Sequence, residues 1–206
     1  MGRVRGKSWM QEHVADAWVK RAKAEGMRSR ASYKLDEIAR RDRLLVPGMT
    51  VVDLGAAPGG WSQVAAERVG PRGRVIALDL LEMPPLPGVT FIRGDFGDAA
   101  ILEQLERALG GRKADLVLSD MAPNLSGIAA TDQARAAALA GLALDFALKH
   151  LKPQGNLLVK TFHGAAYESL LGTLRLRFHK VIARKPEASR SRSREVYVVA
   201  KGPRAA

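Results

Sequence analysis

Residues 50–63, TVVDLGAAPGGWSQ, decide the fold of this chain. The first five are rich in β-branched side chains and end in an acid and a leucine, which is typical of a short buried strand. Residues 55–60 then supply three glycines and a proline, which allow a sharp turn and keep side chains away from a bound molecule. From Trp61 onward apolar residues recur at helical spacing. Strand, glycine-rich turn and helix in this order open a nucleotide-type α/β site.

The turn itself carries no phosphate-binding signature. GAAPGG does not fit the dinucleotide pattern G-x-G-x-x-G, and no Gly-Lys-Ser/Thr follows it as in a P-loop. A turn of this shape indicates a ligand with an adenosine and no pyrophosphate, and S-adenosylmethionine (SAM) is the candidate. Taken alone, the stretch fits a tight turn in an ordinary α/β domain about equally well, so the rest of the chain has to decide.

The composition narrows the classes of protein. The 206 residues suffice for one α/β domain with short appendages, and a monomer is expected. There is no apolar run of ~18 residues, so no membrane span is expected. The first residues lack the apolar segment of a secretory signal, so a cytoplasmic location is expected. The absence of cysteine excludes disulfides, thiolate metal sites and SAM-radical chemistry, and no metal site is expected.

The net charge of +12 is concentrated at the two ends of the chain. Residues 1–43 contain 12 lysines and arginines against 6 acidic residues, and residues 180–206 contain 8 against 2. The middle part is neutral, with 13 of each sign. Basic ends that flank a neutral body indicate contacts with a phosphate backbone, although two solvated basic tails remain the alternative. The RNA-binding candidates are Lys20, Arg28, Arg30, Arg190, Arg192 and Arg194.

The elements alternate after Pro47-Gly48, and helices precede them. Ser29 is a candidate cap for a helix whose apolar face carries Tyr33, Leu35, Ile38 and Leu44. Strands are predicted at 50–54, 74–79, 89–93, 115–119, 156–162, 178–184 and 195–200, and helices at 61–69, 98–109, 132–151 and 165–177. Residues 152–155 are expected to turn between helix and strand. The alternation of strands and helices predicts a doubly wound, Rossmann-like α/β fold with a mostly parallel sheet. No helix is predicted between the strands at 178–184 and 195–200, so the last strand is expected to be antiparallel.

Polar residues end five of the apolar runs: Asp53, Asp79, Asp95, Asp120 and Lys160. In a doubly wound sheet the ligand lies outside the carboxyl ends of the strands. Buried charges are costly unless they are paired or face a site, so four acids and a lysine at one edge predict a functional site.

Two of these strand ends suit an adenosine. Asp79, about twenty residues past the glycine turn, suits a carboxylate that binds the ribose hydroxyls. Asp95 and Phe96 follow the third strand, where the adenine edge would lie. The pattern therefore gives four candidate cofactor-binding residues, namely Gly55, Asp79, Asp95 and Phe96.

Methyl transfer to a ribose hydroxyl requires a base, because the hydroxyl is a poor nucleophile at neutral pH. No histidine lies on the site edge by pattern, and His163 is the one rival. A lysine desolvated in a strand and close to other cations gives up its proton more readily, which favours Lys160 with Asp120 to orient it. A purely structural Lys160–Asp120 ion pair is the alternative.

The segments VVDLGAAPGGWSQ, ALDLLEM, GDF, SDMAPNLSG, VKTFHG and RSREVYVVA closely resemble the FtsJ family of RNA ribose 2′-O-methyltransferases. The likeness runs from about residue 29 to residue 200, and it is greatest to bacterial members that methylate a uridine ribose in large-subunit ribosomal RNA. It implies a SAM-dependent methyltransferase domain over residues 47–201, after a basic helical extension over 1–46 and before a tail at 202–206.

The resemblance also implies a catalytic tetrad, and the matching residues are Lys34, Asp120, Lys160 and Glu195. Lys160 would accept the proton, held by Asp120, while Lys34 and Glu195 would place the ribose and balance the charge. The SAM contacts it implies are Gly59, Trp61, Asp79, Asp95 and Asp120.

Two other functions stay open, and a third is disfavoured. A base N-methyltransferase would carry an aromatic residue after the fourth strand, where this chain reads Asp120-Met121-Ala122-Pro123-Asn124. A 2′-O-methyltransferase of tRNA or another RNA keeps the chemistry and changes the substrate. A non-catalytic ribosome-assembly or RNA-binding factor would have a dead site, but no residue of the tetrad is missing.

Overall fold

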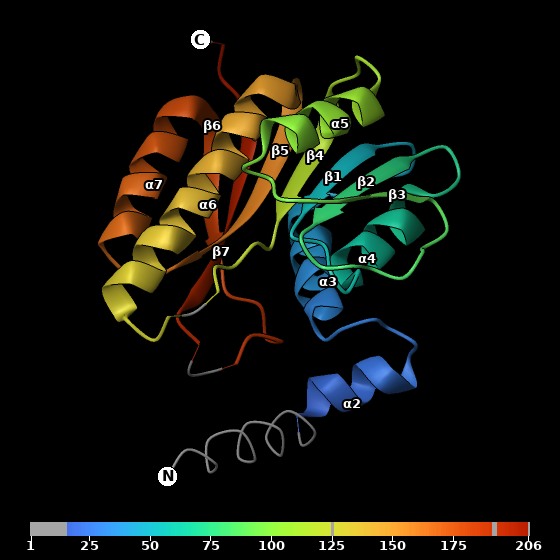
Figure 1. Ribbon diagram of the computed structural model, residues 1–206, viewed down its shortest axis with the longest axis horizontal. Helices are drawn as coiled ribbons and strands as arrows, with labels where there is room; N and C mark the ends of the chain where they lie inside the picture. The colour runs from blue at the N-terminus through green and yellow to red at the C-terminus, as the bar shows by residue number, and fades with distance from the viewer. Residues whose placement is uncertain (1–15, 125, 191–192, 206) are drawn as a thin grey trace.

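The computed structural model describes residues 16–124, 126–190 and 193–205. Seven strands form one sheet in the order β3-β2-β1-β4-β5-β7-β6 (Figure 1). The strands are β1 (Thr50–Leu54), β2 (Arg74–Asp79), β3 (Val89–Arg93), β4 (Ala114–Ser119), β5 (Leu151–Phe162), β6 (Phe178–Arg184) and β7 (Glu195–Pro203). β1 to β5 are parallel, while β7 is antiparallel to both β5 and β6. The predicted doubly wound, Rossmann-like fold with an antiparallel last strand is confirmed.

Helices cover both faces of this sheet (Figure 1). The helices are α2 (Ala17–Ala24), α3 (Ala31–Asp42), α4 (Gly60–Val69), α5 (Ala99–Leu109), α6 (Ala129–His150) and α7 (Ala165–Arg177), of which α2 lies away from the sheet and packs against Tyr33 and Ala188. α3 and α4 bury Leu35, Ile38 and Val64 against one face, and α5, α6 and α7 cover the other. Because it is covered on both sides, β1 is buried along its whole length, as the apolar run predicts.

Two local predictions are wrong. Ser29 does not cap α3: Arg30 holds the N-cap position, and no side chain caps the helix. The reason is that the Ser29 hydroxyl is buried against the start of α4, where a Cβ added to Gly60 would lie 2.2 Å from Oγ. Residues 152–155 do not separate helix from strand, since β5 begins at Leu151 directly after α6. The extra residues form an irregularity inside β5 instead.

The C-terminal strands hold α3 at both of its ends. Near its start, Lys34 contacts Glu195 of β7. At its end, Asp42 accepts two hydrogen bonds of 2.8 Å from the guanidinium of Arg184 in β6. The Asp42 side chain is 4% exposed, so this bidentate ion pair is largely shielded from water. α3 thus packs into the same core as the sheet, and the domain division at residue 46 stays a prediction. Among the described residues, no helix combines the length and apolarity that crossing a membrane requires.

Candidate active site

The glycine turn and the end of β4 touch through their backbones at the carboxyl edge of the sheet. The amide of Asp120 donates to the Leu54 carbonyl at 3.0 Å. Gly55 has a φ of +78°, and a Cβ added there would lie 2.8 Å from the backbone nitrogen of Met121. Glycine is therefore required at position 55 both for its conformation and for the approach of the β4 end.

The four residues of the predicted tetrad come together as two ion pairs. Lys160 Nζ lies 3.0 Å from Asp120 Oδ1 and also donates to the Asp120 carbonyl oxygen. Lys34 Nζ lies 2.6 Å from Glu195 Oε1. The residues come from α3, the end of β4, β5 and β7, so four separate elements converge on one place.

Tyr197 joins the two pairs into one network, and the sequence reasoning missed it. Its hydroxyl donates to Asp120 Oδ1 at 3.1 Å and accepts from Lys34 Nζ at 3.2 Å. The pairing of β5 with β7 sets Lys160 opposite Tyr197, and Glu195 lies two residues away on the same face. The spacing of two residues between Glu195 and Tyr197 could have indicated that both side chains face the site. A tyrosine within an apolar strand, however, is normally interpreted as part of the core.

The network is sheltered and balanced in charge. The side chains of Lys34 and Lys160 are each 9% exposed, against 13% for Glu195 and 20% for Asp120. Burial raises the pKa of Glu195, but the charge and hydrogen bond of Lys34, together with Ser189 and the Lys160 charge, leave that pKa below its ordinary value. Burial and the two carboxylates raise the pKa of Tyr197 well above its ordinary value, so its hydroxyl stays protonated. Two lysines, two carboxylates and a neutral donor therefore share one site.

Asp79 is oriented from both sides at the end of β2. Its Oδ2 accepts from the Ala57 amide and its Oδ1 from the Leu81 amide, each at 2.8 Å. One further lone pair on each oxygen remains for a ligand hydroxyl. Gly59 has a φ of +103°, and a Cβ added there would lie only 2.8 Å from Met83 Sδ, so the position is closed to a side chain.

Asp53 is fully buried beneath the turn. Its Oδ2 accepts from Ser62 Oγ at 2.6 Å, while Oδ1 has no hydrogen-bond partner within the described chain. Burial raises the pKa of Asp53 to about 7, and the charges of Asp120 and Asp79 add to the rise. A buried carboxylate with an unused oxygen next to a glycine turn suits a cationic ligand.

The remaining cofactor candidates differ in their surroundings, and the Trp61 ring lies 5.6 Å from that of Tyr197. Trp61 is 2% exposed and its indole donates to the Ala31 carbonyl at 2.8 Å. Asp95 is exposed and accepts from the Gly97 amide, and Phe96 packs edge-on against Phe146. Their roles toward a cofactor stay predictions.

The two basic ends of the chain meet on one side of the molecule. Ala188, in the loop before β7, packs with Ala22 of α2 and with Tyr33. Arg190 Nε lies 3.6 Å from Asp16, which also pairs with Arg30.

Three other RNA-binding candidates differ in their surroundings. Lys20 is exposed on α2. Arg194 donates to the His163 carbonyl at 3.0 Å, and Arg28 donates to backbone carbonyls. Arg192 lies outside the described residues.

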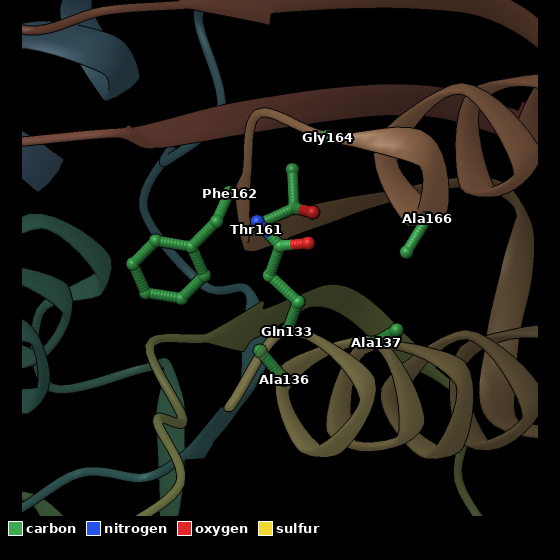
Figure 2. A pocket seen from close by; sticks show the side chains of 7 residues that line it. All are labelled: Gln133, Ala136, Ala137, Thr161, Phe162, Gly164 and Ala166. Atoms are coloured by element: carbon green, nitrogen blue, oxygen red, sulfur yellow. The ribbon is translucent and has the colours of Figure 1, made fainter. Parts of the chain in front are cut away.

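A small depression lies on the α6 and α7 side of the β5 end. It is lined by Gln133, Ala136, Ala137, Thr161, Phe162, Gly164 and Ala166. Figure 2 shows the polar ends of Gln133 and Thr161 facing each other within it. It has room for about one water molecule, so it is too small for a nucleoside.

Comparison with known proteins agrees with this geometry. The sequence profile of the FtsJ-like methyltransferases matches residues 27–203. A protein of Methylobacillus flagellatus named ribosomal RNA large subunit methyltransferase E is 57% identical over 96% of this chain and 95% of its own length. The protein of the same name from Stenotrophomonas maltophilia is 58% identical, over 96% and 94% of the two chains.

Among solved structures, a ribosomal RNA methyltransferase of Plasmodium falciparum superposes with a TM-score of 0.76 at 30% identity. The match covers 85% of this chain and 98% of that one. The fold, the strand-end residues and these relatives agree, and the chain belongs to the FtsJ-like methyltransferase family.

Proposed function

We propose that this protein transfers the methyl group of SAM to the 2′-hydroxyl of a uridine ribose in large-subunit ribosomal RNA, with Lys160 as the general base. The observation that carries the proposal is the Lys34–Tyr197–Asp120–Lys160 network with its Glu195 partner, set beside the glycine turn. Membership in a methyltransferase family supports the reaction class. The names of the relatives support ribosomal RNA of the large subunit as the substrate.

The glycine turn and its surroundings fit SAM. Asp79 is held by amides of the turn and of the segment after β2, and it offers one lone pair on each oxygen for the two ribose hydroxyls. The cofactor supplies an electrophilic methyl group on a sulfonium that leaves without needing an acid.

Lys160 would perform the proton transfer. As the new C–O bond forms and the methyl–sulfur bond breaks, the 2′-hydroxyl proton passes to Lys160 Nζ in its neutral form. Asp120 Oδ1, at 3.0 Å, orients the amine and then stabilises the ammonium that forms. Lys34 and Glu195 would hold the ribose beside this amine, and their opposite charges keep the site balanced.

The basic ends support an RNA substrate. Part of each charge surplus lies on α2, the segment before α3 and the loop before β7, and these segments contact one another close to Glu195. A polyanion that follows this surface would pass the tetrad. Transfer to tRNA, or binding without catalysis, are the competing outcomes of the test below.

The test is transfer of labelled methyl from SAM to free large-subunit rRNA, assembled large subunits and tRNA, with the label mapped to base or ribose. Lys160→Ala should lower the rate at least ~100-fold, the usual contribution of a general base, while SAM binding persists. Lys152→Ala is the matched control. Lys152 also lies on β5 and pairs with an aspartate of β4, Asp115, at 2.7 Å, but near the opposite end of both strands.

The outcomes separate the candidates. Ribose label on ribosomal substrate, lost in Lys160→Ala and kept in Lys152→Ala, supports the proposal. Label on tRNA alone would keep the chemistry and contradict the substrate. RNA binding without any label would point to an assembly factor, and an active Lys160→Ala protein would refute the assignment of the base.

A further inference from the structure

Arg28 lies where three segments of the chain meet. Its Nη1 donates to the Pro84 carbonyl at 2.6 Å and to the Pro58 carbonyl at 3.3 Å, and its Nη2 donates to the Pro85 carbonyl at 2.6 Å. Pro58 belongs to the glycine turn, whereas Pro84 and Pro85 belong to the segment between β2 and β3. One guanidinium thus joins two loops that are distant in sequence.

The backbone around Arg28 is fixed as well. Its amide donates to Gln63 Oε1 of α4 at 3.0 Å, and Gln63 Nε2 donates back to the Gly26 carbonyl at 3.2 Å. The side chain then passes over Gly59, where an added Cβ would lie 3.0 Å from both Cδ and Nη1 of Arg28. The absence of a side chain at Gly59 is therefore what lets the guanidinium reach its carbonyls.

Each of the two joined loops carries a cofactor candidate. Gly59 lies in the glycine turn, and Asp79 directly precedes the second loop. Asp79 also accepts one amide from each loop, those of Ala57 and Leu81, so the same two loops are joined from opposite ends. We propose that Arg28 is a positioning residue for SAM, which holds these loops in the binding arrangement, and is not a phosphate contact for RNA. This inference rests on the proposed use of SAM.

The contacts explain why arginine is needed. Three of its five N–H donors point to neutral carbonyls, so geometry rather than charge determines the fit. A planar fork can serve separate acceptors at once, which the single ammonium of lysine cannot reproduce. A phosphate contact, by contrast, largely survives replacement by lysine, because lysine binds phosphate as a point charge.

Arg28→Lys is therefore the decisive variant. The Kd and KM for SAM should rise about tenfold, as expected for the loss of two or three hydrogen bonds. At saturating SAM, kcat should equal that of the wild type, and so should the Kd for large-subunit rRNA and its salt dependence. Isothermal titration, initial rates and filter binding at several salt concentrations measure these quantities. Lys20→Ala, which removes an exposed charge from α2, should keep the wild-type affinity for SAM.

Three outcomes would overturn the inference. An unchanged KM for SAM in Arg28→Lys, with weaker RNA binding and a salt slope reduced by about 1 in Arg28→Ala, would identify a phosphate contact. A lower kcat with an unchanged KM would indicate only a smaller folded fraction. Equal loss of SAM affinity in Lys20→Ala would show that the effect does not depend on the hydrogen bonds of Arg28. If the wild type itself binds no SAM, the proposed function fails instead.

Discussion

Asp53 makes the stability of this protein depend on pH in a direction opposite to that of most carboxylates. Burial raises its pKa from 3.8 to about 7, so the folded protein keeps a proton that the unfolded chain has lost. The unfolded state therefore binds fewer protons, and the free energy of unfolding falls as pH rises between these two values. At about 1.4 kcal/mol for each pH unit, the full loss is about 4 kcal/mol, of which about 2.5 lies between about pH 5 and pH 8.

Asp53→Asn isolates this effect. Asparagine does not titrate, and its amide oxygen can still accept the hydrogen bond from Ser62. Urea unfolding of SAM-free wild type and Asp53→Asn, followed by circular dichroism, gives the two free energies at each pH. Their difference should shift by about 2.5 kcal/mol in favour of asparagine from about pH 5 to pH 8, because every other carboxylate contributes equally to both proteins. A difference that is the same at both pH values would refute the reasoning.

Two other changes test the described geometry. Tyr197→Phe removes the hydroxyl that joins Lys34 and Asp120. Single-turnover rates should fall about tenfold with an unchanged KM for SAM. An unchanged rate would show that this hydroxyl has no part in catalysis. Gly59→Ala should weaken SAM binding and lower the free energy of unfolding by about 1–3 kcal/mol, because its Cβ meets Met83 and Arg28 at a φ of +103°. Gly110→Ala, also in the left-handed region with a φ of +61° but with no atom within 4 Å, should cost less, and equal losses in urea unfolding would exclude crowding as the cause.

The sheet and its helices could be predicted from the sequence because an apolar run indicates, without knowledge of its neighbours, that the segment is buried. β1 is apolar on both faces since helices cover both, and the bounds predicted for it agree with the structure. The starts of α3 and β5 were less predictable. Ser29 faces the start of α4, and residues 152–155 stay in the strand, and both depend on neighbours distant in the chain.

Those residues of the site that lie at or near the carboxyl ends of strands could be predicted from the sequence. Asp120 and Lys160 follow from the pattern of strand ends, and the structure pairs them. Lys34 and Glu195 came from the family resemblance, because a lysine on a helix face and a glutamate at a strand start carry no sign of their contact. Arg28 was predicted to bind RNA because it is basic. Its partners are backbone carbonyls, which every residue has, so the sequence gives no sign of them.

The ion pair between Lys34 and Glu195 joins positions 161 residues apart. During synthesis, α3 and the glycine turn are translated long before β7. The network of Lys34, Asp120 and Lys160 lacks Glu195 and Tyr197 until that strand lies between β5 and β6. A nascent or C-terminally truncated chain would thus lack the complete network. Activity becomes a late event of folding, and it reports that both ends of the chain have been synthesised and docked.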